Sequence, residues 1–263
     1  MSDFNQRFGG IARLYGTTAT ERLRQARVAV VGIGGVGSWV AEALARTGVG
    51  RLTLIDLDEV CVTNVNRQAH AVTNSIGKPK VEAMRGRLLE IHPECEVVAI
   101  QEYFMPENAG RLLAQGFDVV VDAIDSVKMK CLLIADAKAR RIPVVTVGGA
   151  GGRRDPTLVR VVDLAKTTRD PLLAEVRKRL RREHGFAGDV ESYGVPCAYS
   201  TEPMVYPQSD GGVCDKPEAG ERLRMDCHAG YGSASFVTGA FGFAVAAQVA
   251  RMIAEPSLPG ASA

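Results

Sequence analysis

"VVGIGGVGSWVAEALARTG", residues 30–48, reads as a buried strand, a glycine-rich turn and a helix. Glycines in such a turn let the backbone approach a phosphate, and the helix that follows offers free N–H groups to it. Asp56 lies about 20 residues beyond the turn, where a carboxylate accepts hydrogen bonds from ribose hydroxyls. The stretch predicts a nucleotide site but does not distinguish NAD from ATP. Its candidate phosphate-binding residues are Gly32, Gly34, Gly35, Gly37 and Ser38.

Apolar runs and helical patterns alternate on both sides of this stretch. This alternation predicts an α/β, Rossmann-like fold with a doubly wound, mostly parallel sheet and helices on both faces. Ligands bind such sheets beyond the carboxyl ends of the strands. Strands are expected at 28–31, 52–55, 97–100, 118–121 and 144–147, and helices at 36–46, 78–91 and 128–139.

The 263 residues are interpreted as a single domain with three parts. An ATP-binding core covers 7–155, a substrate-side extension covers 156–254, and 255–263 form a flexible tail. In the extension we expect an antiparallel strand at 158–162 and a basic helix at 171–184. The segment 185–228 is rich in Gly, Pro, Ser and Cys, so it is expected to form loops over the site.

Residues 229–250 carry no charge and are numerous enough to span a bilayer. Their glycine, hydroxyl and alanine content favours a terminal buried helix instead, and no stable membrane insertion is expected. The N-terminal residues lack the apolar core of a signal peptide, and six scattered cysteines fit a reducing compartment. We therefore expect a cytoplasmic protein, with membrane association through 229–250 as the alternative. A net charge of +2 favours no particular partner.

The polar residues after the second strand favour ATP over NAD. Arg67 and Lys80 supply cations that could meet the charge developing as pyrophosphate leaves. In "DAIDS", Asp125 is expected to bind Mg²⁺ that bridges phosphate oxygens, and Asp122 either contacts the cofactor or only supports the turn. A dehydrogenase would need a proton-transfer residue near the nicotinamide, and no histidine lies in a setting of that kind.

These motifs resemble those of the ATP-dependent activating enzymes of the ThiF/MoeB and ubiquitin-activating type. The resemblance covers residues 7–155 and rests on "GxGGxGS", "NxNRQ" at 64–68, Lys80 and "DAIDS". It implies a MgATP pocket that adenylates a carboxylate. It also implies a homodimer in which an arginine from the partner's N-terminal segment completes the site; Gly10 stands at the family's position, so Arg13 or Arg7 is the candidate. The further site residues that it implies are Asp58, Asn66 and Gln68.

The C-terminal blocks resemble one branch of that family, the tRNA threonylcarbamoyladenosine dehydratases. Among them are "TVGGAGGRRDPT" at 146–157 and "STEPMVYPQSDGGVC" at 200–214. The resemblance implies ATP-dependent cyclisation of threonylcarbamoyladenosine in tRNA, through adenylation of the threonyl carboxylate. It also implies a sulfur-transfer partner of the cysteine desulfurase type and a structural monovalent cation, Na⁺ or K⁺. Paired C-x-x-C motifs are missing from the sequence, so we expect no zinc.

Two other interpretations stay open: an adenylating activator of a ubiquitin-like sulfur carrier, and a nucleotide-binding scaffold of a sulfur-relay complex. The run "RKRLRR" fits either tRNA phosphate contacts or a solvated helix face. Cys227 is the first cysteine to test as a nucleophile, although an intramolecular cyclisation does not require one. The basic candidates for tRNA binding are Arg177, Lys178, Arg179, Arg181 and Arg182.

Overall fold

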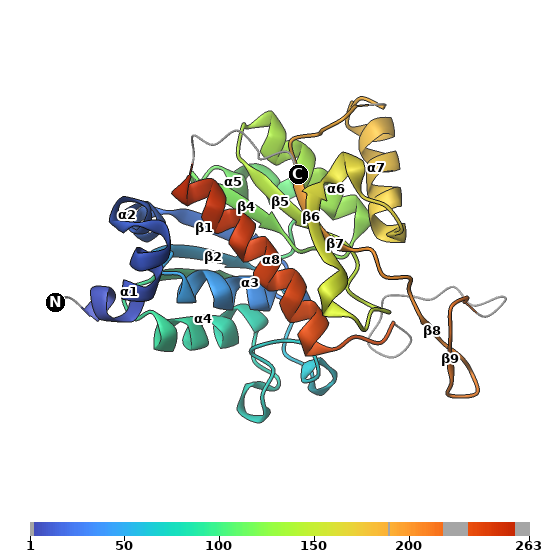
Figure 1. Cartoon of the computed structure of the whole chain (residues 1–263), viewed down its shortest axis with the longest axis horizontal. Coiled ribbons are helices and arrows are strands. Elements are labelled where there is room, and N and C mark those ends of the chain that lie inside the picture. The colour runs from blue at the N-terminus through green and yellow to red at the C-terminus, as the bar shows by residue number, and fades with distance from the viewer. Residues whose placement is uncertain (1–2, 189, 218–230, 256–263) are drawn as a thin grey trace.

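The computed structural model describes residues 3–188, 190–217 and 231–255 of the chain. Its centre is a seven-stranded sheet with the strand order β3-β2-β1-β4-β5-β7-β6 (Figure 1). Every neighbouring pair is parallel except β7 and β6, so the expected mostly parallel sheet with an antiparallel addition is confirmed. The strands are β1 (Arg27–Val31), β2 (Arg51–Ile55), β3 (Glu96–Ile100), β4 (Val119–Asp122), β5 (Val144–Val147), β6 (Val159–Asp163) and β7 (Pro196–Ser200).

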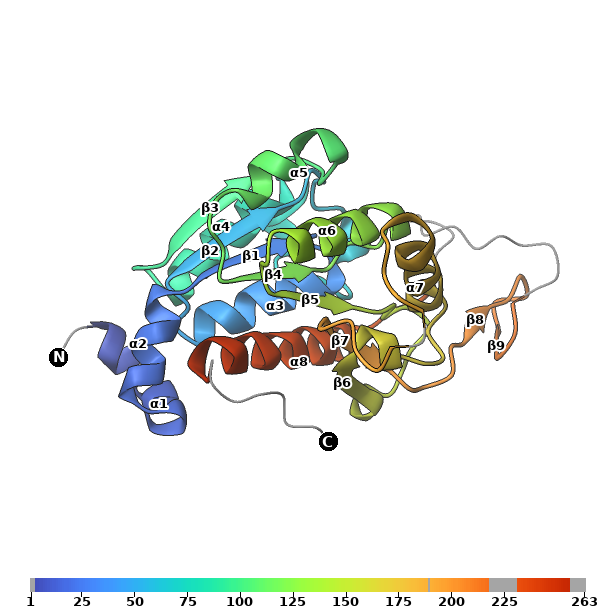
Figure 2. The ribbon, with the colours of Figure 1, turned by 90° about the horizontal axis from the view of Figure 1, so that it is seen from above.

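Helices cover both faces of the sheet (Figure 2). Because side chains alternate along a strand, Val28 and Val30 of β1 face one hydrophobic cluster, and Ala29 and Val31 face another. The first cluster lies under α3 (Gly35–Arg46), α4 (Lys80–Ile91) and α8 (Ser235–Ala254). The opposite face is covered by α5 (Pro106–Leu113), α6 (Val127–Ala139) and α7 (Pro171–Glu183).

Two N-terminal helices that the sequence patterns did not predict lie at the amino-terminal edge of the strands. They are α1 (Asp3–Tyr15) and α2 (Thr17–Gln25). Phe4 and Phe8 of α1 are buried, and their rings approach Gly48 at the end of α3. Gly48 has a φ of 83°, and a Cβ there would lie 3.1 Å from the Phe8 ring, so glycine suits this turn on both counts.

The prediction that 185–228 form only loops was wrong for β7. This strand lies inside the sheet, parallel to β5 and antiparallel to β6. Its sequence, PCAYS, has neither alternating polarity nor a run of β-branched residues, and four of its five residues are buried because both of its faces are covered. The short hairpin of β8 (Tyr206–Pro207) and β9 (Val213–Cys214) follows it.

The terminal helix α8 packs closely on α3. A Cβ on Gly242 would lie 2.5 Å from the Trp39 Cβ, so glycine allows the two helix backbones to approach. Within the described residues, α8 is the helix with the length and mean hydropathy, 1.5 over its most apolar window, to cross a membrane, and 50% of that window is buried. Core helices of soluble proteins meet the same criterion. Phe236 and Phe243 are exposed, so the helix is buried on one side only.

The sheet changes winding direction between β1 and β4. Chains leaving the carboxyl ends of these neighbouring strands cross over in opposite directions, which opens a crevice between their loops. The glycine turn after β1 and the "DAIDS" loop after β4 meet at this point, where Ala123 N donates a hydrogen bond to Val31 O at 2.8 Å. The fold therefore brings together two motifs that are about 90 residues apart in the chain.

Candidate nucleotide-binding site

The glycine turn is packed against the loop that follows β4. Gly32 has a φ of 90°, and a Cβ there would lie 2.7 Å from the carbonyl oxygen of Ala123. A Cβ on Gly37 would lie 1.8 Å from the carbonyl oxygen of Gly32, so neither position accepts a side chain. Gly34 is the N-cap of α3, and no side chain caps this helix. The first N–H groups of α3 are therefore free of a side-chain cap, as in phosphate sites at helix starts.

Asp56 holds this turn in place from the end of β2. Its Oδ2 accepts a hydrogen bond from Ile33 N at 2.6 Å, and its Oδ1 accepts one from Asp58 N at 2.9 Å. Burial raises the pKa of Asp56 above its ordinary value, although Lys80 and the two backbone donors oppose the shift. Contact of Asp56 with a ribose stays a prediction.

Lys80 is buried at the first turn of α4 and is paired with Asp58. The Lys80 Nζ lies 2.7 Å from Asp58 Oδ2, and the Tyr103 hydroxyl donates to Asp58 Oδ1 at 2.6 Å. Desolvation opposes ionisation of Asp58, but these two donors outweigh it and hold its pKa below the ordinary value. The hydrogen bond to Asp58 raises the pKa of Tyr103 to about 12. Sequence reasoning missed Tyr103, whose only signal was its place just after a predicted strand.

The backbone of Arg67 is held by hydrogen bonds, and its side chain lies beside the start of α3. Its carbonyl accepts hydrogen bonds from Trp39 Nε1 at 2.9 Å and Thr238 Oγ1 at 3.0 Å. Its Cγ would lie 3.7 Å from a Cβ on Gly35, and its Nη1 donates to the carbonyl of Thr63 at 2.7 Å. No carboxylate within the described ranges pairs with the guanidinium, so its charge is available to a phosphate. Trp39 and Thr238 were not among the predicted site residues.

Asn66 and Gln68 flank Arg67 but differ in exposure. Asn66 is exposed, and its Nδ2 donates to the carbonyl of Ser233 at 2.7 Å. Gln68 is buried, and its Oε1 has no hydrogen-bond partner in the described part of the chain. Asn66 thus connects the nucleotide loop to the segment before α8, while Gln68 faces the interior.

Ser38 and Asp122 were predicted to contact the cofactor, but both side chains are fully buried. The Ser38 Oγ accepts a hydrogen bond from Ala69 N at 3.1 Å, so it fastens α3 to the loop that carries Arg67. Asp122 lies below the crevice and pairs with another buried residue, Lys130. Because neither side chain has an exposed surface, direct contact with a nucleotide is not supported for them. Asp122 has the supporting position that the sequence left open.

The pair of Asp122 and Lys130 stabilises the loop that carries Asp125. Lys130 Nζ lies 2.8 Å from Asp122 Oδ2, which also accepts a hydrogen bond from Thr146 Oγ1 at 2.6 Å. Asp122 Oδ1 accepts from Ile124 N at 3.2 Å and thereby fixes the first turn of the loop. Asp125 is exposed at the crevice, where its carboxylate forms no ion pair with another described residue.

Arg13 lies far from the glycine turn of its own chain. It is exposed in the last turn of α1, at the amino-terminal edge of the sheet, whereas the crevice opens at the carboxyl edge (Figure 1). Arg7, the alternative, is paired with Asp3 at 2.7 Å on the same helix. Either arginine could reach a nucleotide site only in a second copy of the chain.

The basic run lies on α7, whose glutamates neutralise part of its charge. Lys178 pairs with Glu175 at 3.6 Å, and Arg179 and Arg182 both pair with Glu183. Arg177 donates to the Thr167 hydroxyl. Arg181 is exposed and has no ion pair in the portion of the chain described. Contact of this helix with tRNA stays a prediction.

Of the cysteines near the extension, Cys227 lies outside the described residues. Cys197 is fully buried in β7, and burial raises the pKa of its thiol well above the ordinary value, which makes it unreactive. Cys214 is exposed on β9.

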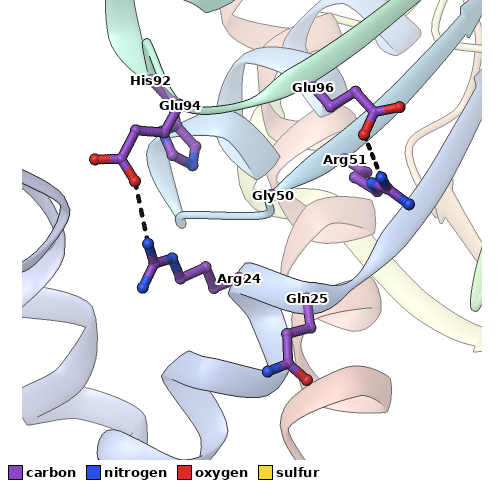
Figure 3. Close-up of a pocket in the computed structure, with 7 residues that line it drawn as sticks. All are labelled: Arg24, Gln25, Gly50, Arg51, His92, Glu94 and Glu96. Carbon is purple, nitrogen blue, oxygen red and sulfur yellow. Dashed lines mark hydrogen bonds and ion pairs between the residues drawn. The ribbon is translucent and has the colours of Figure 1, made fainter.

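A hollow of 380 Å³ at the opposite edge of the sheet has the wrong chemistry for a nucleotide (Figure 3). It lies among residues that precede β1 and residues that precede or begin β2 and β3. Its two arginines are already paired, Arg24 with Glu94 at 3.2 Å and Arg51 with Glu96. A phosphate would have to displace these carboxylates, so the crevice at the switch point remains the candidate site.

Comparison with known proteins yields one family. A model of the ThiF family matches residues 9–260. The tRNA threonylcarbamoyladenosine dehydratase of Escherichia coli (strain K12) is 50% identical over 260 residues, which cover 98% of this chain and 97% of that relative. A crystal structure of the E. coli tRNA N6-threonylcarbamoyladenosine dehydratase in complex with ATP superposes with a TM-score of 0.85, at 45% identity and over 96% of each chain.

A second group of relatives matches over a shorter length. The molybdopterin-synthase adenylyltransferase of Salmonella typhimurium is 35% identical over 136 residues, which cover 52% of this chain and 54% of that relative.

Proposed function

The chain belongs to the ThiF family, and on that premise we propose that it catalyses the ATP-dependent dehydration of threonylcarbamoyladenosine in tRNA. The observation that carries the proposal is a full-length match, at 50% identity, to a dehydratase of that name. It is supported by the crevice, because an uncapped helix start, two cations and an exposed carboxylate all follow the carboxyl ends of strands at one edge of the sheet.

The residues of the crevice suit ATP as follows. The N–H groups at the start of α3 would bind phosphate oxygens, and Arg67 and Lys80 would stabilise the charge that develops as pyrophosphate leaves. Asp56 would accept hydrogen bonds from the ribose. Asp125 suits Mg²⁺, because this ion commonly takes one or two protein carboxylates and completes its shell with phosphate oxygens and water. Bound there, the ion would neutralise phosphate charge; within the described residues, no cluster of three His, Cys, Asp or Glu offers a fuller metal site.

The reaction proceeds in two steps, adenylation and ring closure. An oxygen of the threonyl carboxylate attacks the α-phosphorus of ATP, the bond from that phosphorus to the bridging oxygen breaks, and pyrophosphate leaves. An atom of the neighbouring carbamoyl group then attacks the activated carbonyl carbon, AMP leaves with the former carboxylate oxygen, and a carbamoyl proton is released. The nucleoside has lost the elements of water. The protein contributes orientation and charge stabilisation rather than a covalent intermediate.

The second candidate function is activation of a ubiquitin-like sulfur carrier. The match to molybdopterin-synthase adenylyltransferase favours it, but that match covers only 52% of the chain. A carrier activator should exchange pyrophosphate into ATP when given a carrier tail that ends in Gly-Gly. The dehydratase should instead form AMP only with tRNA that carries threonylcarbamoyladenosine.

The proposal includes partners and a location. Arg13 cannot reach the crevice of its own copy, because α1 lies at the opposite edge of the sheet. We propose a homodimer in which Arg13 of one copy reaches the crevice of the other. A monovalent cation, a sulfur-transfer partner and a cytoplasmic location are expectations from the family resemblance.

The central experiment is mass spectrometry of the tRNA nucleosides after incubation with ATP and the protein. We expect threonylcarbamoyladenosine to lose the mass of one water. Arg67→Ala should abolish this conversion while leaving the fold intact, because Arg67 is the cation found beside Gly35 in the described part of the chain. Arg85→Ala removes an exposed arginine of α4 that pairs with Glu82, and it serves as the matched control. AMP release that is the same with unmodified tRNA would contradict the proposal.

A further inference from the structure

Three cationic side chains are buried in the described part of the chain, and one of them lacks a carboxylate partner. Lys80 pairs with Asp58 at 2.7 Å, and Lys130 pairs with Asp122 at 2.8 Å. Arg153 is 2% exposed and donates a hydrogen bond from Nη2 to the carbonyl of Arg169, at 3.1 Å. Its Nε and Nη1 have no hydrogen-bond partner among the described residues. A buried charge in this condition is costly unless something else binds it.

The carboxylates near Arg153 are already engaged by backbone donors. Asp170 accepts hydrogen bonds from Gly149 N at 2.9 Å and from Leu173 N at 3.0 Å. Glu202 accepts from the backbone N–H groups of Arg154 and Asp155, both at 2.9 Å. Burial lowers the pKa of Arg153, and the charges of Asp170 and Glu202 oppose that shift through space. Neither carboxylate forms a hydrogen bond with the guanidinium among the described residues, so their charges only partly offset the cost of its burial.

Hydrogen bonds connect the loop that carries Arg153 to the loop that carries Arg67. Its neighbour Gly152 donates a backbone hydrogen bond to the carbonyl of Gly232 at 2.7 Å. The next residue, Ser233, accepts from Asn66 Nδ2, also at 2.7 Å. The two consecutive residues Gly232 and Ser233 therefore connect the loop after β5 to the loop that carries Arg67.

Two tyrosine rings lie near the loop that carries Arg153, and Tyr206 is close enough for its charge to act on the guanidinium. The rings of Tyr206 and Tyr231 meet edge to face at 5.7 Å, and a Cβ on Gly151 would lie 2.9 Å from the Tyr231 Cβ. Aromatic rings beside a cation are typical of sites for unstacked RNA bases.

We infer that Arg153 binds the carboxylate of the threonyl group of the tRNA substrate. This assignment rests on the proposed function. A guanidinium forms strong, charge-assisted hydrogen bonds with a planar carboxylate. A backbone phosphate of tRNA is the other possible source of an oxyanion, but it would meet exposed Arg154 more readily than buried Arg153. Because Arg153 is covered, the side chains around it must open when the carboxylate enters, as happens in sites closed by loops.

The test compares Arg153→Met with Arg154→Met, which removes the adjacent exposed arginine. Affinity is measured for tRNA with and without threonylcarbamoyladenosine, together with the affinity for MgATP and the thermal midpoint. We expect Arg153→Met to lower affinity for the modified tRNA about 10-fold or more, the range of a charge-assisted hydrogen bond. Affinities for unmodified tRNA and MgATP should not change, and the midpoint should hold or rise because an unpaired buried charge is gone. Arg154→Met should keep the preference for modified tRNA.

Three results would overturn the assignment. Equal weakening with both tRNAs would indicate a phosphate contact. A lower thermal midpoint with no change in the preference for modified tRNA would indicate a structural role. An unchanged variant would show that Arg153 binds no part of the substrate.

A probe on the wild-type protein covers the case in which Arg153→Met does not fold. The nucleoside threonylcarbamoyladenosine should raise the thermal midpoint, and its carboxyl methyl ester, which lacks the negative charge, should not. Equal shifts with acid and ester would contradict carboxylate recognition. Failure of the proposed function is separately visible, as wild-type protein that forms no dehydrated nucleoside.

Discussion

His70 should make the stability of this protein fall as the pH decreases from 7 to 5. Its imidazole is 2% exposed, and neither ring nitrogen has a hydrogen-bond partner among the described residues. Burial lowers the pKa of His70 from 6.5 to about 4, and the charges of Lys80 and Arg87 add to the shift. At a pH between these two pKa values, His70 is protonated in the unfolded chain and neutral in the folded protein. The stabilising contribution is therefore complete above pH 6.5 and is lost as the pH falls toward 4.

The size of the effect follows from the shift. The lowering of the His70 pKa from 6.5 to about 4 corresponds to about 3 kcal/mol of unfolding free energy once the pH is below both values. Between pH 7 and pH 5 the unfolded state gains most of its proton, which amounts to about 2 kcal/mol. Domains are commonly stable by about 5–15 kcal/mol, so the change is a large fraction of the total.

Urea denaturation of wild type and His70→Leu at the two pH values measures this effect. The imidazole makes no hydrogen bond within the described structure, so an apolar replacement of similar size should cost little at pH 7. The variant should lose about 2 kcal/mol less than wild type between pH 7 and pH 5. His184→Leu, at the end of α7, reports what the loss of any imidazole does. If His70→Leu and wild type lose the same stability, the burial argument is wrong.

Three further changes test the site. Asp125→Ala should reduce nucleoside dehydration at least ~100-fold, because on the proposal this carboxylate binds the ion that neutralises phosphate charge. The unfolding midpoint in urea should not change, because the carboxylate is exposed. Activity near that of wild type would exclude Asp125 from the site. Lys130→Met should cost about 3–5 kcal/mol of unfolding free energy in urea, because it leaves the carboxylate of Asp122 buried and uncompensated; the double change with Asp122→Leu should recover much of that loss, and no recovery would refute the pairing argument. Replacing Arg181 and Arg182 with Gln should weaken tRNA binding and lower the slope of log affinity against log salt by about 1 for each phosphate that is no longer neutralised; an unchanged slope would assign these side chains to a solvated face.

The sequence alone predicted the parallel sheet, the glycine turn and most residues of the crevice. The prediction of the sheet is confirmed, and the roles of the crevice residues stay predictions; both could be made because each signal is local. A strand–turn–helix pattern carries its own geometry, and the carboxyl ends of parallel strands necessarily share an edge. Hence Gly34, Arg67, Lys80 and Asp125 could be placed at one edge without knowledge of the strand order.

The features that the sequence could not supply depend on what packs against a residue. β7 has no periodic pattern that the sequence could reveal. Its place inside the sheet follows from its pairing with β5 and β6. Tyr103 becomes a site residue only because its hydroxyl reaches Asp58.

Charge and burial divide in the same way. The sequence states that Arg153, Lys130 and the arginines of α7 are cations, but the cost of each charge depends on its distance from solvent and from a carboxylate. Tertiary structure alone made Lys130 a paired interior ion and left the guanidinium of Arg153 with free donors among the described residues. It also placed Arg13 at the edge of the sheet away from its own crevice. Arg13 could therefore contact a nucleotide only in the crevice of a second copy of the chain. The sequence therefore determined which of these residues carry a charge. Their protonation, pairing and accessibility were set by neighbours that are distant in the chain.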